Sequence, residues 1–168
     1  MENIEFKIKL SVTDLYYFMM HHYYTKISGI FGIVLSLAAA VILCVRFSSL
    51  DGTGKMLLII IALLFTVINP IMLWTKAAGQ ITANKSLGGE LTYILDTRHL
   101  TIQLGEEKAD VPWEQVTKVK DNGRELVVYV TAARGYIWPK RQIREQYDHI
   151  TDCLKKSVDA GKIHLKNK

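Results

Sequence analysis

The sequence predicts an α+β protein in which a transmembrane helical hairpin is joined to a small antiparallel β domain. The stretches Ile27–Val45 and Met56–Trp74 are each nineteen residues long and contain no charged side chain. At about 1.5 Å of rise per residue, a helix of this length spans the hydrocarbon core of a bilayer, which is roughly 30 Å thick. After Trp74, several short runs alternate between apolar and polar side chains, which is typical of strands.

The composition of the two stretches favours membrane insertion over a cleaved signal peptide. The second stretch contains twelve Leu, Ile, Val or Phe residues. At roughly −0.4 kcal/mol each they favour insertion by about −5 kcal/mol, which outweighs Asn69 and Pro70. A signal peptide begins with a short basic segment that leads directly into an apolar core. Here twenty-six residues precede the first stretch, and they include Glu2, Glu5 and Asp14.

The distribution of Lys and Arg predicts that both termini lie in the cytoplasm. Arg46 and Lys55 flank the short turn between the stretches, whereas the two outer flanks carry five basic residues: Lys7, Lys9, Lys26, Lys76 and Lys85. The side with more basic residues is the cytoplasmic side. The net charge of the chain is +5. This mild excess favours a position beside anionic lipid headgroups, but without a clustered basic stripe it does not favour nucleic acid as a partner.

Local signals at the N-terminus predict a strand followed by a helix. Residues Ile4–Leu10 alternate strictly between apolar and charged side chains. Ser11 and Asp14 have the spacing of a capping box, so we expect a helix to begin near Val12. The N-terminal strand can join the sheet of the C-terminal domain, which would bring the two soluble ends of the chain together.

The hairpin carries two features that bear on helix packing. Small residues recur every four positions in the first stretch, and such a stripe lets two helix backbones approach closely. We expect the second stretch to cover this stripe, and a second copy of the chain or another membrane protein is the alternative. Asn69–Pro70 should kink the second helix, and Thr66 and Asn69 are placed to hydrogen-bond across the hairpin. The stripe consists of Ser28, Gly32, Ser36 and Ala40.

The C-terminal part reads as a series of strands followed by one amphipathic helix. A helical extension over Lys76–Ser86 precedes the strands and ends at Gly88–Gly89. Gly105–Asp110 is predicted to be a polar turn, and Gln142–Ala160 to be a helix with one apolar stripe. The stripe comprises Ile143, Tyr147, Ile150, Leu154 and Val158. The strands are predicted at Glu90–Leu95, Leu100–Leu104, Gln115–Val119, Leu126–Val130 and Tyr136–Trp138.

This order of elements predicts a partial barrel of the pleckstrin-homology kind, capped by the C-terminal helix. The expected organisation has four parts. An N-terminal strand and juxtamembrane helix occupy residues 1–26, and the transmembrane hairpin occupies residues 27–74. A helical linker covers residues 75–88, and the β domain covers residues 89–168.

Five features of the sequence resemble the YcxB-like family of small bacterial membrane proteins. They are the opening strand followed by Ser11–Leu15, the two closely spaced apolar stretches, and the segments Leu91–Leu95, Val111–Val116 and Tyr136–Arg141. The resemblance extends over nearly the whole chain. It implies a membrane hairpin and a cytoplasmic domain that resembles bacterial pleckstrin-homology folds. It implies no established reaction and supplies no catalytic residues.

The sequence contains no recognisable catalytic or metal-binding motif, and we predict no cofactor. Adjacent side chains on a helix point about 100° apart, so His21 and His22 are poorly placed to bind one metal ion. Cys44 and Cys153 do not suggest a disulfide framework or a zinc site. Six basic residues could present positive charge to lipid headgroups or to a partner, with an ordinary solvated surface as the alternative. They are Lys118, Lys120, Arg124, Lys140, Arg141 and Arg144.

The expected function is that of a membrane-anchored, non-enzymatic binding or scaffold module in a bacterial inner membrane. Its β domain would bind a protein partner, or a second copy of the chain, through a sheet edge or a groove. Two alternatives stay open. The chain could be an accessory or regulatory subunit of a transporter or envelope complex, or a membrane enzyme that acts on lipid or envelope precursors.

Overall fold

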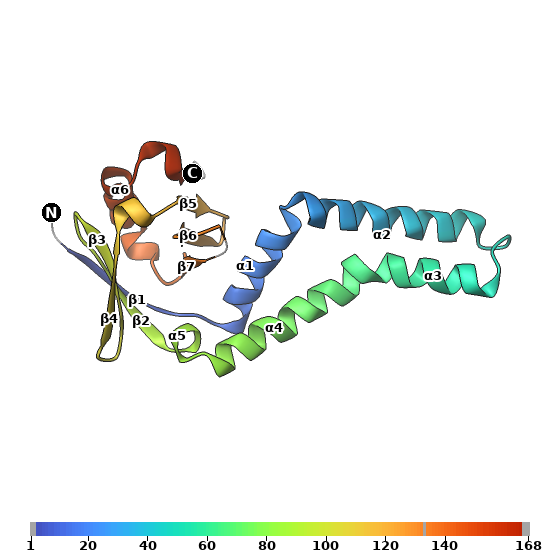
Figure 1. Cartoon of the computed structure of the whole chain (residues 1–168), viewed down its shortest axis with the longest axis horizontal. Coiled ribbons are helices and arrows are strands. Elements are labelled where there is room, and N and C mark those ends of the chain that lie inside the picture. The colour runs from blue at the N-terminus through green and yellow to red at the C-terminus, as the bar shows by residue number, and fades with distance from the viewer. Residues whose placement is uncertain (1–2, 133, 166–168) are drawn as a thin grey trace. The chain divides into compact units, whose positions relative to one another are not determined.

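The computed structural model describes residues 3–132 and 134–165. The chain divides into two compact units, a β unit (residues 1–15 and 80–168) and a helical unit (residues 16–79). The helical unit is therefore inserted into the β unit near its N-terminal end. Figure 1 shows the consequence: the first strand lies beside strands that follow the helical unit in the sequence.

The helical unit contains the two apolar stretches as an antiparallel pair of helices (Figure 1). Both are long and apolar enough to cross a membrane: the most apolar 18-residue segment within residues 27–46 has a mean hydropathy of 2.6, and that within residues 52–83 has one of 2.7. Among the described residues, all of the large apolar side chains that are exposed lie between Ile27 and Trp74. The elements are α1 (Val12–Tyr24), α2 (Ile27–Arg46), α3 (Gly52–Leu63), the π-helical η1 (Leu64–Ile68) and α4 (Asn69–Ala83).

Small residues of α2 pack within the hairpin. Gly32 lies so close to the Phe65 ring that a Cβ atom there would overlap it, and the Ser36 hydroxyl donates a hydrogen bond of 2.8 Å to the carbonyl of Ile61. The buried residues of α2 are Gly29, Gly32, Ser36 and Ala39, whereas Ser28 is exposed and Ala40 is half-buried. A strict spacing of four drifts around a helix with 3.6 residues per turn, so the buried seam follows spacings of three and four instead.

The helix break near Pro70 takes the form of a π-helical turn. Proline has no backbone N–H, so it cannot close an α-helical hydrogen bond, and the Asn69 N–H donates to the carbonyl of Leu64, five residues earlier. The Asn69 side chain donates to the Tyr24 hydroxyl (3.1 Å) at the end of α1, so its hydrogen bond leaves its own helix but ends just before the first predicted span rather than in it. For Thr66 the expectation of a hydrogen bond across the hairpin is wrong, because its hydroxyl donates to the carbonyl of Ala62 in its own helix.

One sheet of the β unit joins the N-terminal strand to three consecutive strands. Its antiparallel order is β1-β2-β3-β4, and Ile4 of β1 pairs with Leu95 of β2. The alternation predicted for β1 is confirmed, since Phe6 and Ile8 are buried and Glu5 and Lys7 are exposed. The strands are β1 (Ile4–Lys9), β2 (Glu90–Leu95), β3 (His99–Leu104) and β4 (Glu107–Pro112), and the short helix α5 (Lys85–Gly88) precedes β2.

The second sheet has the order β7-β6-β5-β8. Strand β6 is central, and its residues Glu125–Val128 are all buried. The pairs β5–β6 and β6–β7 are antiparallel, whereas the two-residue strand β8 pairs with β5 in parallel. The elements are β5 (Lys118–Asp121), β6 (Glu125–Tyr129), β7 (Gly135–Pro139) and β8 (Ile163–His164), and the 3-10 helix η2 (Trp113–Gln115) links the sheets.

The last helix is shorter than predicted. Helix α6 covers Tyr147–Ser157, flanked by the 3-10 helices η3 (Arg144–Gln146) and η4 (Ala160–Lys162). The α-helix begins at Tyr147 rather than at Gln142, because Ile143 and Gln146 have ψ angles of 13° and 3°, outside the α-helical range. The predicted apolar stripe is largely confirmed, with Tyr147 half-buried and the other four side chains buried: Ile143, Ile150, Leu154 and Val158.

Two strand predictions in the C-terminal part are wrong. Most of Gly105–Asp110 is not a turn, because the chain reverses at Gly105 (φ 60°) and then forms β4. Strand β4 lies at the sheet edge with Glu107–Asp110 exposed, so it lacks the alternation that reveals a half-buried strand. Strand β5 begins at Lys118 rather than Gln115, because residues 113–115 form the 3-10 turn.

Candidate functional site

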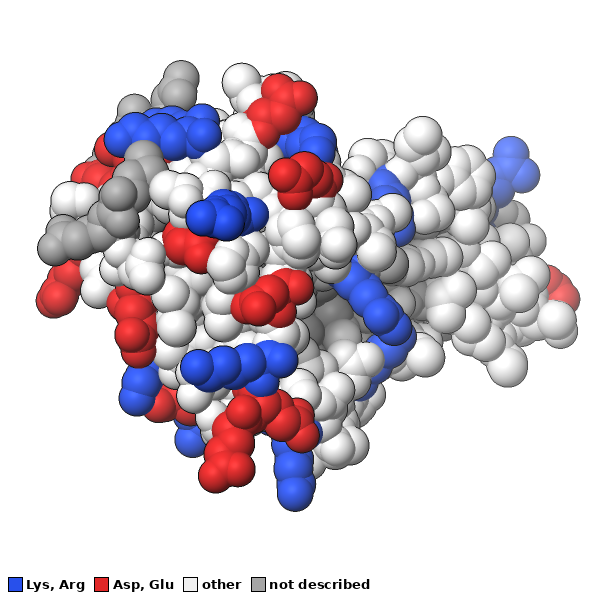
Figure 2. All heavy atoms as spheres, turned by 60° about the vertical axis from the view of Figure 1, so that its left-hand side comes forward, with Lys and Arg blue, Asp and Glu red and all other residues white. Residues whose placement is uncertain are grey.

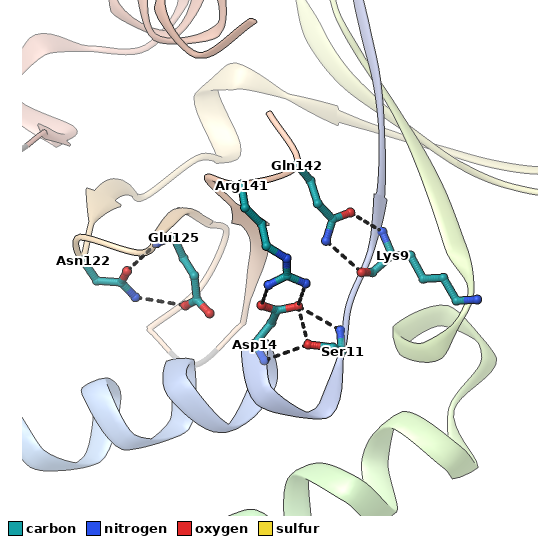
Figure 3. A network of polar contacts seen from close by, with 7 residues as sticks. All are labelled: Lys9, Ser11, Asp14, Asn122, Glu125, Arg141 and Gln142. Carbon is teal, nitrogen blue, oxygen red and sulfur yellow. Dashed lines mark hydrogen bonds and ion pairs between the residues drawn. The ribbon is translucent and has the colours of Figure 1, made fainter. Parts of the chain in front are cut away.

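Several polar side chains of the β unit lie close together near the start of α1 (Figure 3). Ser11 and Asp14 form the predicted capping box: the Ser11 N–H donates to Asp14 Oδ2 (2.9 Å), and the Asp14 N–H donates to Ser11 Oγ (3.2 Å). Leu10 and Leu15, on either side of the box, are buried, as a hydrophobic staple requires. The box therefore fixes the start of α1 and leaves the Asp14 carboxylate facing the second sheet (Figure 3).

Arg141 binds this carboxylate with both terminal nitrogens of its guanidinium group. Nη2 donates to Asp14 Oδ2 (2.8 Å), and Nη1 pairs with Oδ1 (Figure 3). The Asp14 side chain is only 6% exposed. Burial opposes ionisation of Asp14, but the hydrogen bonds from Arg141 and Ser11 outweigh it and lower the pKa of the carboxyl. The pair is thus an ionised clamp between the start of α1 and the end of β7.

A second carboxyl group, that of Glu125, lies buried in the same region. The Asn122 side chain donates to Glu125 Oε2 (3.1 Å), and Asn122 Oδ1 accepts from the Glu125 N–H (2.9 Å) (Figure 3). Glu125 is 1% exposed, and burial raises its pKa to about 7, with the Asp14 charge acting in the same direction. Of the groups in this region, Glu125 is therefore one that exchanges a proton near neutral pH.

The Asp121 carboxylate accepts hydrogen bonds from two residues beyond β7. Lys140 Nζ lies 2.6 Å and the Tyr147 hydroxyl 2.9 Å from Asp121 Oδ2. Its other oxygen accepts from the Gly123 N–H (2.7 Å), in a turn where Gly123 adopts a φ of 102°. Burial opposes ionisation of Asp121, but these donors lower its pKa, and burial together with Asp121 raises that of Tyr147 to about 12.

The six basic residues singled out from the sequence do not share one role. Lys140 and Arg141 neutralise buried carboxylates, as described above. Lys118 and Lys120 lie two positions apart on β5 and so share one face of the sheet, whereas Arg124 lies in the following turn and Arg144 in η3. In Figure 2, basic and acidic side chains are interspersed over the β unit. Contact of these residues with headgroups therefore stays a prediction.

The histidines and cysteines lie in separate parts of the structure. His22 stacks on Phe18, and His99 Nδ1 lies 3.0 Å from Asp96. Cys44 is exposed on α2, and Cys153 is buried on α6. Within residues 3–132 and 134–165, no group of three His, Cys, Asp or Glu side chains is arranged to hold a metal ion.

Comparison with known proteins gives one match. Residues 95–153 match the family model described as YcxB-like protein. The chain carries a YcxB-like domain. No curated protein and no solved structure matches the chain. The resemblance identified from the sequence is therefore confirmed for residues 95–153, and the two apolar helices are consistent with the membrane hairpin that it implies.

The YcxB-like match covers only part of the polar network. It begins at the last residue of β2 and ends within α6, so it includes Glu125 and Arg141. Ser11 and Asp14 lie outside it, on the N-terminal side of the inserted helical unit. The network thus joins the YcxB-like segment to the residues that lead into the first apolar helix.

The sequence did not single out Asp14, Asp121 or Glu125 as members of one network. A partial signal was available for Glu125, because it immediately precedes the apolar run Leu126–Val128. Such a run is typical of a strand buried on both faces, and a carboxyl at its start shares that burial. The partnership of Asp14 and Arg141 has no local signal, because the two residues are 127 positions apart.

Proposed function

We propose that this chain is a membrane-anchored, non-enzymatic binding or scaffold module. One observation carries the proposal: the exposed large apolar side chains of the described residues are confined to a helical unit that interrupts the β unit between β1 and β2. Such a surface is unfavourable in water and is matched by lipid. The β unit would then be tethered to the bilayer at two points, through α1 and through α4.

We further propose that the β unit is a partial barrel of the pleckstrin-homology kind. Two features support this finer description, namely the two four-stranded sheets and a C-terminal helix whose residues Ile150 and Leu154 are buried. A compact domain with free sheet edges offers binding surfaces without needing a reaction centre. In this proposal the domain acts as an adaptor beside the membrane.

The proposed location is the inner membrane of a bacterium, with both termini in the cytoplasm. The five basic residues of the outer flanks against two at the α2–α3 turn support this orientation. The bilayer itself is the first partner. The second partner is an unidentified membrane protein or another copy of the chain.

Gly32 and Ser36 do not support a separate contact with a transporter or envelope complex. Both residues are covered within the hairpin, by Phe65 and by the Ile61 carbonyl respectively. The accessory-subunit and lipid-enzyme alternatives therefore remain expectations from the sequence, and we propose neither.

A crosslinking pull-down with the full-length chain in its native membranes tests the proposed function. We expect the chain to stay in the membrane fraction after alkaline washing and to capture a reproducible partner. The Gly32→Leu variant, which should lose hairpin packing through a clash with Phe65, is compared with the matched control Ser28→Leu on the exposed side of the same helix. Recovery of the intact chain in the aqueous fraction, or capture of nothing reproducible, contradicts the proposal.

A further inference from the structure

Strand β1 presents unpaired backbone groups along one side. It lies at the end of its sheet, and within residues 3–132 and 134–165 no strand adjoins its outer side. The N–H and C=O groups of Lys9 point outward, since both bond to Gln142 rather than to β2. Backbone direction alternates along an antiparallel strand, so the corresponding groups of Glu5 and Lys7 also point outward.

The contact between Gln142 and Lys9 shows that the outer edge of β1 can form a pair of backbone hydrogen bonds with another group. The Gln142 side-chain amide accepts from the Lys9 N–H (3.0 Å) and donates to the Lys9 carbonyl (2.9 Å), as Figure 3 shows. An adjacent strand would make the same pair of hydrogen bonds through its backbone. Gln142 therefore ends the available edge at Lys9 and leaves the part from Asn3 to Lys7 open.

A hollow of about 630 Å³ lies beside the open part of this edge. One wall is the beginning of β1, and the other is the face of α6 that carries His149 and Cys153. Its apolar lining includes Ile4 and Leu95. A strand added to β1 would direct alternate side chains into this hollow and the others toward solvent.

The hollow is acidic although the chain is basic. Its lining contains the carboxylates of Glu5, Asp96 and Asp152 and the single ammonium group of Lys156, while the chain as a whole has a net charge of +5. Asp152 forms a 3.6 Å ion pair with Lys155, in which both side chains are more than half exposed. An exposed pair of this kind is screened by water, so the negative character of the hollow persists.

We propose that the outer edge of β1 and the adjoining hollow bind an extended polypeptide segment rich in Lys or Arg by strand addition. Backbone groups of Glu5 and Lys7 supply the hydrogen bonds, and the carboxylates at the hollow select positive side chains. This inference rests on the proposed function, because it names the surface through which the module would bind its partner. The occupant is a partner peptide with positive side chains, because the hollow is lined by three carboxylates and one ammonium group, with the excess of negative charge at Glu5 and Asp96.

Binding of a short peptide to the purified full-length chain in lipid nanodiscs tests the inference. The probe is a fluorescent peptide that alternates valine and lysine, and its control has glutamate in place of lysine. We expect the lysine peptide to bind and the glutamate peptide not to bind. Hydrogen exchange should show new protection at the Glu5 and Lys7 amides when the lysine peptide is present.

Two pairs of variants separate the contributions of backbone and charge. Lys7→Pro removes an outward N–H that is not used within the sheet and should weaken binding about fivefold to tenfold, whereas Lys7→Ala keeps the N–H. Asp152→Lys should weaken binding about fivefold, whereas Glu114→Lys makes the same change of charge on an exposed residue outside the hollow. If Lys7→Pro unfolds the β unit, Asp152→Lys still tests the site.

The possible outcomes distinguish this inference from the proposed function. Equal binding of the two peptides, or unchanged binding by Asp152→Lys, overturns the inference. Dimerisation without peptide that Lys7→Pro abolishes also overturns it, in favour of a second copy on the edge. If the native pull-down captures a partner equally well with both variants, the module function stands and this surface is wrong. If the unaltered chain captures nothing, the proposed function fails.

Discussion

Arg141 binds the Asp14 carboxylate through both terminal guanidinium nitrogens. The two residues are 127 positions apart, and the whole helical unit lies between them in the sequence. Asp14 belongs to the first turn of α1, and Arg141 lies two residues after Pro139, the last residue of β7. The clamp therefore fastens the residues that lead into the first apolar helix to the second sheet. Substitution of either residue should lower the free energy of unfolding of the β unit.

We expect Asp14→Asn to lower the free energy of unfolding of the β unit by about 2 kcal/mol, through loss of the charge pair and weakening of the cap. This loss of unfolding free energy is smaller than the loss expected for a fully buried ion pair, because the Arg141 side chain is 57% exposed to water. Urea unfolding of the detergent-solubilised chain, followed by tryptophan fluorescence, measures it. Lys155→Met breaks only an exposed pair and should change the value by less than about 0.5 kcal/mol. An Asp14→Asn variant as stable as the unaltered chain contradicts the structural role of the clamp.

Glu125 should make the β unit less stable as the pH rises. Its pKa in the folded chain is about 7, above its ordinary value of 4.5, so between these values the folded state binds more protons than the unfolded state. The free energy of unfolding due to this group therefore falls from about pH 4.5 to about pH 7 and stays low above that range. Asp14 and Asp121, whose pKa values are lowered, act in the opposite sense at more acidic pH.

Glu125→Gln removes this pH dependence while keeping an acceptor for Asn122. We expect the variant to match the unaltered chain at about pH 4 and to exceed it by up to about 3 kcal/mol at about pH 8. Urea unfolding at the two pH values measures the difference, and Glu106→Gln in the exposed β3–β4 turn is the control. A variant that is less stable than the unaltered chain at the higher pH would show that the Glu125 carboxylate is stabilised in its charged form.

Gly32→Leu should disrupt the packing of the hairpin, because the added side chain overlaps the Phe65 ring. Overpacking of this kind costs about 1–3 kcal/mol, so the thermal midpoint of helix loss in detergent should fall. Ser28→Leu lies on the exposed side of the same helix and should have little effect. Phe65→Ala should partly restore the midpoint of Gly32→Leu by making room. If Ser28→Leu is the more damaging change, the buried face of α2 is assigned wrongly.

The sequence correctly predicted the helices and strands that are determined by residues close together in the chain. The Ser11–Asp14 box placed the start of α1 correctly, because both hydrogen bonds of the box lie within four residues. Strict alternation identified β1 and β2, each of which has one buried and one accessible face. Strand β4 was missed because it is accessible on both faces over Glu107–Asp110, and pairing with β3 rather than burial holds it in the sheet.

The polar network could not be predicted, because its members meet only through the fold. Arg141 was singled out for its charge as a residue that could contact headgroups or a partner, and the sequence did not indicate that it binds Asp14. Lys140 likewise binds Asp121, a residue that the sequence did not single out. The two pairings join residues that are 127 and 19 positions apart, so the composition and local spacing of the sequence do not reveal them.

Accessibility of single cysteines in intact cells tests the central claim, which is a hairpin in the membrane with the β unit in the cytoplasm. In a chain with Cys44 and Cys153 replaced, a membrane-impermeant maleimide should label Ser49→Cys in the α2–α3 turn without permeabilisation. Glu106→Cys in the β3–β4 turn should be labelled only after the cells are permeabilised. Labelling of Glu106→Cys in intact cells, with Ser49→Cys protected, would contradict the proposed orientation. Labelling of neither position before permeabilisation and both after it would contradict a hairpin that spans the membrane.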